Sequence, residues 1–164
     1  MPIGDPMRRI ACLILPAFAA LLGGPPAAAQ VCTVSTAGTA FGVYDPFAAA
    51  PTDSVGSVTV QCQAAVAIGI SYSVALGPGG SGNGAARLLR SGDSSLGYQL
   101  YSDAARTQVW GDGTGGGRAV SGLLLLTLGR LSLLNSLPVY GRIAARQNVA
   151  AGSYVDTIQV LLTY

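Results

Sequence analysis

Three residue types are absent from this 164-residue sequence: it contains no histidine, no glutamate and no lysine. Every acidic side chain is therefore an aspartate and every basic one an arginine, and the formal net charge is only +2. Without histidine there is no Ser–His or Cys–His nucleophile pair, and without glutamate and lysine most common general acids and bases are missing. The small net charge gives no electrostatic reason to bind nucleic acid or an acidic membrane. The composition therefore predicts a protein that is not an enzyme, holds no cofactor and does not bind nucleic acid.

The start of the sequence is typical of a secretory signal peptide. Arg8 and Arg9 precede the apolar run IACLILPAFAALLGG, which is followed by PPAAAQ. A membrane anchor is the alternative, but a proline interrupts the run, which is shorter than the roughly 20 apolar residues of a membrane span. We predict that cleavage after Ala29 removes residues 1–29 and leaves one exported domain, residues 30–164.

Two cysteines remain in the predicted mature chain, Cys32 and Cys62. An exported protein with two cysteines most simply forms one disulfide. Such a bridge closes a loop of about 30 residues and stabilises the fold by about 3–4 kcal/mol. A metal site is not expected, because the chain has no histidine and no third mature cysteine.

Two aspartates could in principle act as an acid and a base, but the aspartates of the mature chain have a simpler explanation. Nearly all of them lie beside glycine, proline or serine in predicted turns, which aspartate favours because it bonds to nearby main-chain amides. They are Asp45, Asp53, Asp93, Asp103, Asp112 and Asp156. Two glycine-rich stretches, residues 77–82 and 111–116, match a phosphate-binding pattern, but neither leads into a helical pattern. Both are therefore predicted to be loops.

The mature chain has the pattern of an all-β protein. Short runs of Val, Ile, Thr and Tyr are separated by Gly, Pro, Asn and Asp, as is typical of strands joined by turns. Apolar and polar residues alternate most clearly in residues 54–64, 67–77 and 154–164. Further strands are predicted at residues 31–35, on both sides of a Ser-Gly-Asp turn at 91–93, and from Pro138 onward. A short extended piece is predicted at Phe41–Tyr44. Seven or eight short strands predict an antiparallel β-sandwich.

The leucine-rich stretch Leu123–Leu137 has two possible structures. Its leucine content would suit a helix, but Gly129 interrupts it and Gly122 and Pro138 flank it. We therefore predict two strands with a turn near Gly129 and Arg130. The role of the stretch stays open between buried core, a strand that closes the sheet, and an exposed adhesive patch.

Five motifs, taken in order, resemble the spore coat protein U family, which includes the pilin subunits of archaic chaperone–usher (Csu-type) pili. The resemblance covers nearly all of the mature chain. The motifs are CTVS, FGVYDP, GSVTVQC, LGYQLYSDAARTQVWGDG and PVYGRIAARQNVAAGSYVDTIQVLLTY.

This resemblance implies an immunoglobulin-like sandwich that lacks its last strand. The missing strand would leave an apolar groove beside the C-terminal strand, filled first by a periplasmic pilus chaperone and then, at an outer-membrane usher, by a strand from another pilin subunit. The protein would pass through the periplasm and end on the cell surface or in an extracellular fimbrium. The implied groove edge is the apolar row of the last strand: Ile158, Val160, Leu162 and Tyr164.

One departure from the family pattern concerns the segment before Cys32. A pilin that polymerises needs a donor strand ahead of its first cysteine, and only Gln30 and Val31 remain there after the predicted cleavage. We therefore expect a subunit that accepts a strand but does not donate one, at a fibre tip or outside the fibre. The alternative is a self-contained secreted binding module in which Leu123–Leu137 completes the sheet.

Overall fold

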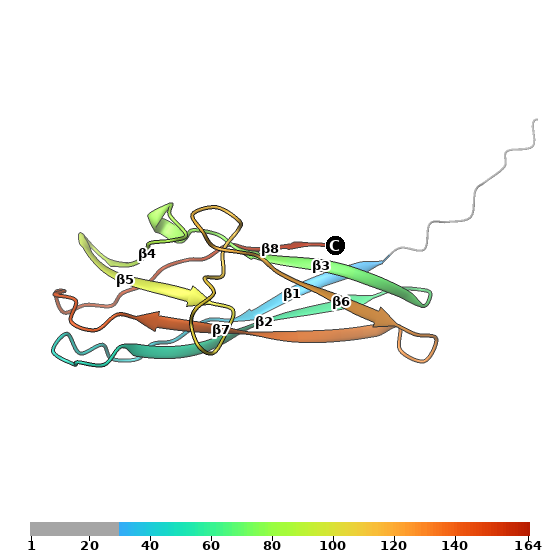
Figure 1. Ribbon diagram of the computed structural model, residues 1–164, viewed down its shortest axis with the longest axis horizontal. Helices are drawn as coiled ribbons and strands as arrows, with labels where there is room; N and C mark the ends of the chain where they lie inside the picture. Colours follow the sequence, from blue (N-terminus) through green and yellow to red (C-terminus); the bar gives the residue numbers. More distant parts are fainter. Residues whose placement is uncertain (1–29) are drawn as a thin grey trace, which may run out of the picture.

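The computed structural model describes residues 30–164, so the predicted signal peptide lies outside the described residues. The described part has eight strands and one short 3-10 turn, η1, and no helix in it is long and apolar enough to cross a membrane (Figure 1). The elements are β1 (Val31–Ala37), β2 (Thr52–Gln63), β3 (Ile68–Leu76), η1 (Gly79–Ser81), β4 (Arg87–Ser91), β5 (Ser94–Tyr101), β6 (Val120–Leu126), β7 (Ser132–Ile143) and β8 (Val160–Thr163).

The strands form two sheets. The larger has the order β1-β2-β7-β5-β4 and the smaller has the order β6-β3-β8. All pairs of neighbouring strands are antiparallel. The prediction of an all-β antiparallel sandwich is therefore confirmed, and eight strands in two sheets agree with an incomplete immunoglobulin-like domain.

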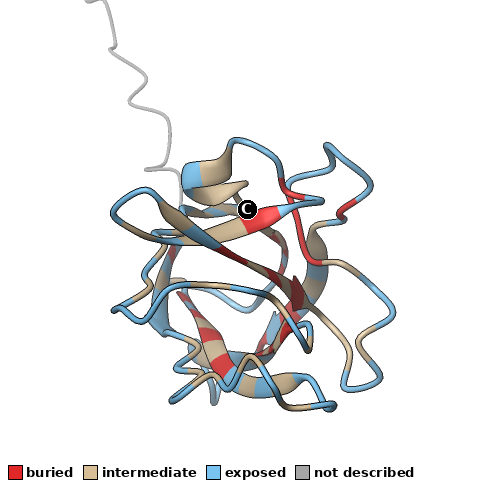
Figure 2. Cartoon of the chain, turned by 90° about the vertical axis from the view of Figure 1, so that its left-hand side faces the viewer, coloured by how far each residue is buried: buried red, intermediate tan, exposed pale blue. Residues whose placement is uncertain are grey.

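The core lies between the inner faces of the two sheets, and strand alternation determines which residues enter it. On β2, Val58, Val60 and Cys62 point inward and are at most 2% exposed, whereas the residues between them face outward or are only half-buried. β3 contributes Ile70, Tyr72, Val74 and Leu76 in the same way. Figure 2 looks along the long axis of the molecule and shows the buried segments of both sheets. Each fully buried aliphatic side chain stabilises the fold by about 1.5–3 kcal/mol.

The leucine-rich stretch forms two strands, as predicted, but they belong to different sheets. β6 joins the smaller sheet and β7 the larger, and a tight turn connects them. In this turn the amides of Thr127 and Arg130 each donate to the other residue's carbonyl oxygen, at 3.0 and 2.8 Å. The chain therefore crosses between the sheets at one end of the sandwich.

The leucines of β6 divide between the core and the surface. Leu124 and Leu126 are buried, whereas Leu123 and Leu125 are 57% and 63% exposed. This alternation follows from the pleat of the strand, which directs successive side chains to opposite faces. The stretch is thus partly core and partly exposed apolar surface.

The strand start predicted at Pro138 is wrong, because β7 runs without a break from Ser132 to Ile143. At Pro138 the strand pairs with β2, while β5 pairs only with residues 140–143. One edge of β7 is therefore unpaired at this point, where a residue without an amide hydrogen is tolerated.

Candidate functional site

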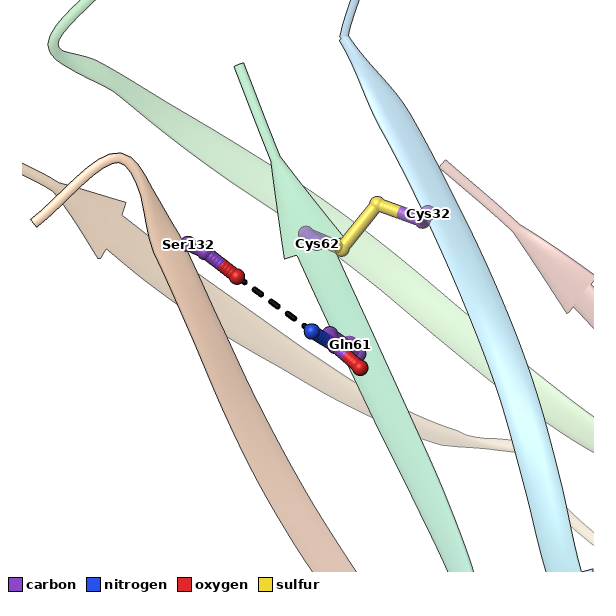
Figure 3. The surroundings of a disulfide bond; sticks show 4 residues. All are labelled: Cys32, Gln61, Cys62 and Ser132. Carbon is purple, nitrogen blue, oxygen red and sulfur yellow. Dashed lines mark hydrogen bonds between the residues drawn. A yellow bond between two sulfur atoms is a disulfide. The ribbon is translucent and has the colours of Figure 1, made fainter.

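One edge of the larger sheet is β1, which pairs only with β2. Cys32 lies directly opposite Cys62 in this pair, with their Cα atoms 4.1 Å apart, and the two form the expected disulfide (Figure 3). On the other side of β2, the side-chain amide of Gln61 donates to Ser132 Oγ at 3.3 Å. β1 is thus fastened to the sheet through a covalent bond while its outer edge has no strand partner within residues 30–164.

The C-terminal segment passes from one sheet to the other. Val155 pairs with Arg90 on β4 through two main-chain hydrogen bonds of 2.8 and 3.0 Å. Further along, the carbonyl oxygen of Gln159 accepts a 2.8 Å hydrogen bond from the amide of Gly77, and β8 then pairs with β3. The expected single strand from residue 154 is therefore wrong: the chain changes partner on the way, and only residues 160–163 form β8.

The four residues predicted for the groove edge do not all have the same surroundings. Ile158, Val160 and Leu162 are half-buried and pack against the core, whereas Tyr164 is 49% exposed. Leu161, between two of the packed residues, is 60% exposed and faces outward. Within residues 30–164, β8 pairs only with β3, and the inward face of this segment carries an apolar row.

Two neighbouring clefts lie between the C-terminal segment and the chain that follows β1. The smaller cleft has a volume of about 210 Å³, and its lining includes residues 36–39, Ile158 and Val160. The larger cleft has a volume of about 830 Å³, and its lining includes residues 39–44, Pro46 and residues 149–156. Both are lined by inward-facing apolar residues of the larger sheet. We call the two clefts together the groove, since four residues line both of them: Thr39, Phe41, Leu89 and Asp156.

The segment after β1 forms one wall of the groove without being a strand. The short extended piece expected at Phe41–Tyr44 pairs with no neighbour, and Gly42 has a φ of 72° that suits glycine best. Phe41 packs edge-on against Tyr98, with ring centroids 6.0 Å apart. The hydroxyl of Tyr44 donates to the carbonyl oxygen of Ala144 at 3.0 Å. Side-chain contacts rather than strand pairing therefore hold this wall, among them a 2.7 Å hydrogen bond from Ser54 Oγ to the carbonyl oxygen of Ala40.

Asp156 lies where the two clefts meet, and three hydrogen bonds hold its carboxylate. Oδ2 accepts from the hydroxyl of Tyr98 at 2.7 Å, and Oδ1 accepts from the amides of Gly80 and Thr157, both at 2.8 Å. Burial raises the pKa of Tyr98 well above its usual value, and the hydrogen bond to Asp156 and its negative charge add to this effect. Tyr98 therefore remains a neutral hydrogen-bond donor.

Behind this position lies Arg87, which is completely buried. Its guanidinium donates to one side-chain oxygen, that of Gln99, and otherwise to main-chain carbonyl oxygens; the latter belong to Leu76, Gly77, Gly84 and Trp110. Burial lowers the pKa of Arg87, and the charges of Asp112 and Asp156 oppose that shift. Arg87, on β4, thus joins the end of β3, β5 and the loops at Gly84 and Trp110 into one unit.

Sequence reasoning missed Arg87, Tyr98 and Asp156 as a group. Arg87 stands in an ordinary polar-apolar strand pattern, and Asp156 was assigned to a turn. Neither residue carries a local signal for a contact that spans tens of residues along the chain. Residues 30–164 contain no group of three or more metal-ligating His, Cys, Asp or Glu side chains. Among the described residues, the groove combines an apolar lining with the carboxylate of Asp156 and lies beside unpaired strand edges.

These features define a class of protein: an immunoglobulin-like sandwich with an apolar groove beside the free edge of its last strand. The chain belongs to the Spore Coat Protein U domain family, whose model matches residues 18–161. It is 31% identical to Protein U of Myxococcus xanthus over 133 residues, which cover 76% of this chain and 70% of that protein.

A solved structure shares the fold. It is the crystal structure of the CsuC-CsuE chaperone-tip adhesion subunit pre-assembly complex from archaic chaperone-usher Csu pili of Acinetobacter baumannii. The match has a TM-score of 0.54 and 22% identity, and covers 83% of this chain. This chain spans only 40% of the matched chain.

Proposed function

We propose that this protein is an exported structural subunit of a surface pilus or fimbrium, and that its groove accepts a β-strand from a partner protein. The partners are a periplasmic pilus chaperone during transit and, after transfer at an outer-membrane usher, another subunit. The observation that carries the proposal is the edge of β8 that has no strand partner within residues 30–164, beside the cleft that Ile158 and Val160 line. Leu162 continues their row and packs against the core.

The physical reason lies in what an added strand supplies. Its main chain would pair with the free edge of β8, and every second side chain would enter the groove. An unpaired apolar edge otherwise promotes aggregation, which is why such a subunit needs a chaperone. The proposed groove edge includes Tyr164, whose exposed ring an added strand would cover.

A second candidate is a self-contained secreted binding module. It is favoured by one observation: Val60, Val74 and Trp110 are 0% exposed without any partner strand. In this case the groove is a surface feature and the exposed leucines of β6 form the binding surface.

Periplasmic expression of residues 30–164, with and without a co-expressed pilus chaperone, separates the two candidates. We expect the chain expressed alone to aggregate in the periplasm, and a soluble one-to-one complex to form with the chaperone; chain refolded from denaturant at low concentration then serves for binding and stability measurements. A soluble monomer that melts cooperatively and forms no complex would contradict the strand-acceptor proposal and support the binding module.

A pair of neighbouring substitutions on β8 tests where the partner binds. Val160→Asp places a charge on the row that faces the groove, and we expect it to abolish the complex. Leu161→Asp places the same charge on the exposed outer face and should leave the complex intact. Equal loss of the complex in both variants would argue against binding along the inner row.

A further inference from the structure

The chemistry of the groove changes at one position along its length. Among the described residues that line the two clefts, only Asp156 carries a charge, and it lines both clefts. On either side of it the lining is mainly apolar. A strand lying in the groove would therefore pass an apolar cleft, then a carboxylate, then a second apolar cleft.

The carboxylate of Asp156 is fixed in this position and has bonding capacity left. Its Oδ1 already accepts two hydrogen bonds, from Gly80 and Thr157, but Oδ2 accepts only one, from Tyr98. A carboxylate oxygen can accept two hydrogen bonds. Because Tyr98 and two main-chain amides hold the carboxylate, it cannot turn away when a strand covers it.

Covering this carboxylate with an apolar side chain is unfavourable, because water leaves Oδ2 and nothing replaces it. A partner side chain that donates a hydrogen bond removes this penalty. Arg87 donates to the carbonyl oxygen of Gly77, three residues before Gly80, whose amide donates to Asp156, so a positive charge already lies near the carboxylate. The charge of Asp156 correspondingly opposes the lowering of the Arg87 pKa. A second positive charge at this point would be repelled by Arg87, which favours a neutral donor.

We propose that Asp156 selects the strand that binds in the groove: the partner strand carries a short neutral hydrogen-bond donor, such as threonine or serine, between two inward-facing apolar residues. Alternate residues of a strand face the same side, so the pattern is apolar, polar donor, apolar at every second position. This inference rests on the proposed function and adds to it the chemistry of the partner strand.

Three synthetic peptides of about 10 residues, the upper end of the usual strand length, provide the test. Their inward positions carry leucine on both sides of a central residue, so the pattern is the same in either strand direction. The central residue is threonine, valine or lysine, and the outward positions are serine and lysine for solubility. Binding to residues 30–164 is measured by fluorescence anisotropy with labelled peptides.

Threonine and valine have nearly the same shape, so which of the two peptides binds more tightly reports on the chemistry of the site and not on its size. An apolar pocket binds valine more tightly, because valine is the more hydrophobic residue. With Asp156 facing the central position, we expect the threonine peptide to bind about tenfold more tightly than the valine peptide and more tightly than the lysine peptide. In Asp156→Ala the preference should reverse to valine.

Different results overturn the role of Asp156 and the strand-acceptor function. Equal or tighter binding of the valine peptide to the unaltered chain overturns the role of Asp156 and leaves the strand-acceptor function in place. Tighter binding of the lysine peptide overturns the choice of a neutral donor. If none of the three peptides binds, the strand-acceptor function fails and this inference fails with it. The comparison of peptides on the unaltered chain does not depend on whether Asp156→Ala folds.

Discussion

The guanidinium of Arg87 donates a 3.0 Å hydrogen bond to the carbonyl oxygen of Trp110, and both residues are completely buried. The indole nitrogen of Trp110 in turn donates to the carbonyl oxygen of Val74 on β3, at 2.9 Å. Two residues far apart in the sequence thus connect β4 of the larger sheet with β3 of the smaller one. Since β3 is the strand on which β8 pairs, this connection also supports the free edge beside the groove.

Replacing Arg87 with lysine should destabilise the protein strongly. Lysine keeps the charge but cannot reproduce the planar fork of donors, so several buried carbonyl oxygens lose their partner. We expect a loss of about 2–4 kcal/mol in the free energy of unfolding, measured by urea denaturation. Arg90→Lys, on the exposed face of the same strand, is the control and should change stability by less than about 0.5 kcal/mol. Equal urea midpoints for the two variants would contradict this role of Arg87.

Removing the disulfide should destabilise the protein, because it joins β1 to β2. The double variant Cys32→Ser, Cys62→Ser loses the covalent closure of a loop with a sequence separation of 30 residues. We expect a loss of about 3–4 kcal/mol in the free energy of unfolding. Reduction of the unaltered protein with dithiothreitol should lower its stability to a similar extent, while the double variant should not respond to the reductant. A response of the double variant would show that the reductant acts elsewhere.

The sequence predicted those parts of the fold that depend on local pattern. Alternation along β2 placed Cys62 on the buried face, and the two mature cysteines left one possible pair. The turn near Gly129 followed from a glycine between two apolar runs. The strand and turn signals lie within a few residues of the features they predict, whereas the disulfide followed because the predicted mature chain has only two cysteines.

The parts that could not be predicted depend on contacts between distant segments. The C-terminal segment looked like one strand because its alternation is continuous, yet it pairs first with Arg90 and then with β3. Nothing in the local pattern says which neighbour each half meets. The same holds for Asp156, whose partner Tyr98 is 58 residues away in the sequence.

Tyr98 should make the protein sensitive to alkaline pH. Burial, with the contribution of Asp156, raises its pKa above the value of 10.0 that it has when unfolded. The stabilising effect is therefore complete below pH 10 and is lost as the pH rises, because the unfolded chain releases the proton first. Above pH 10 we expect the free energy of unfolding to fall by about 1.4 kcal/mol per pH unit from this group. Tyr98→Phe should remove that part of the slope in urea titrations between pH 9 and 11.5 (chosen to bracket the tyrosine pKa of about 10). An unchanged slope would contradict the assignment.

The length of chain ahead of Cys32 decides whether the subunit can also donate a strand. If processing occurs after Ala29 as predicted, the secreted protein starts at Gln30 and has only two residues before the first cysteine. We expect intact-mass spectrometry of the protein purified from the periplasm to give the mass of residues 30–164 with one disulfide. A start well before Gln30 would leave enough chain for a donor strand and remove the reason for placing this subunit at a fibre tip.

Gly141 on β7 leaves space for the ring of Phe41 in the groove wall. A larger residue at this position should therefore weaken binding of a strand peptide. A Cβ atom at Gly141 would lie 2.7 Å from the ring of Phe41, which packs on Tyr98 and lines both clefts. We expect Gly141→Ala to displace Phe41, to lower the free energy of unfolding by about 1–3 kcal/mol, and to weaken binding of the threonine peptide. Gly69→Ala on β3 is the matched control. Its Cβ atom would meet only two side chains of the neighbouring strand β6, Leu125 at 3.4 Å and Leu123 at 3.6 Å, on the outer face of the smaller sheet. If both variants bind the peptide as the unaltered chain does, Phe41 is not part of the binding surface, and the strand must lie nearer to β8.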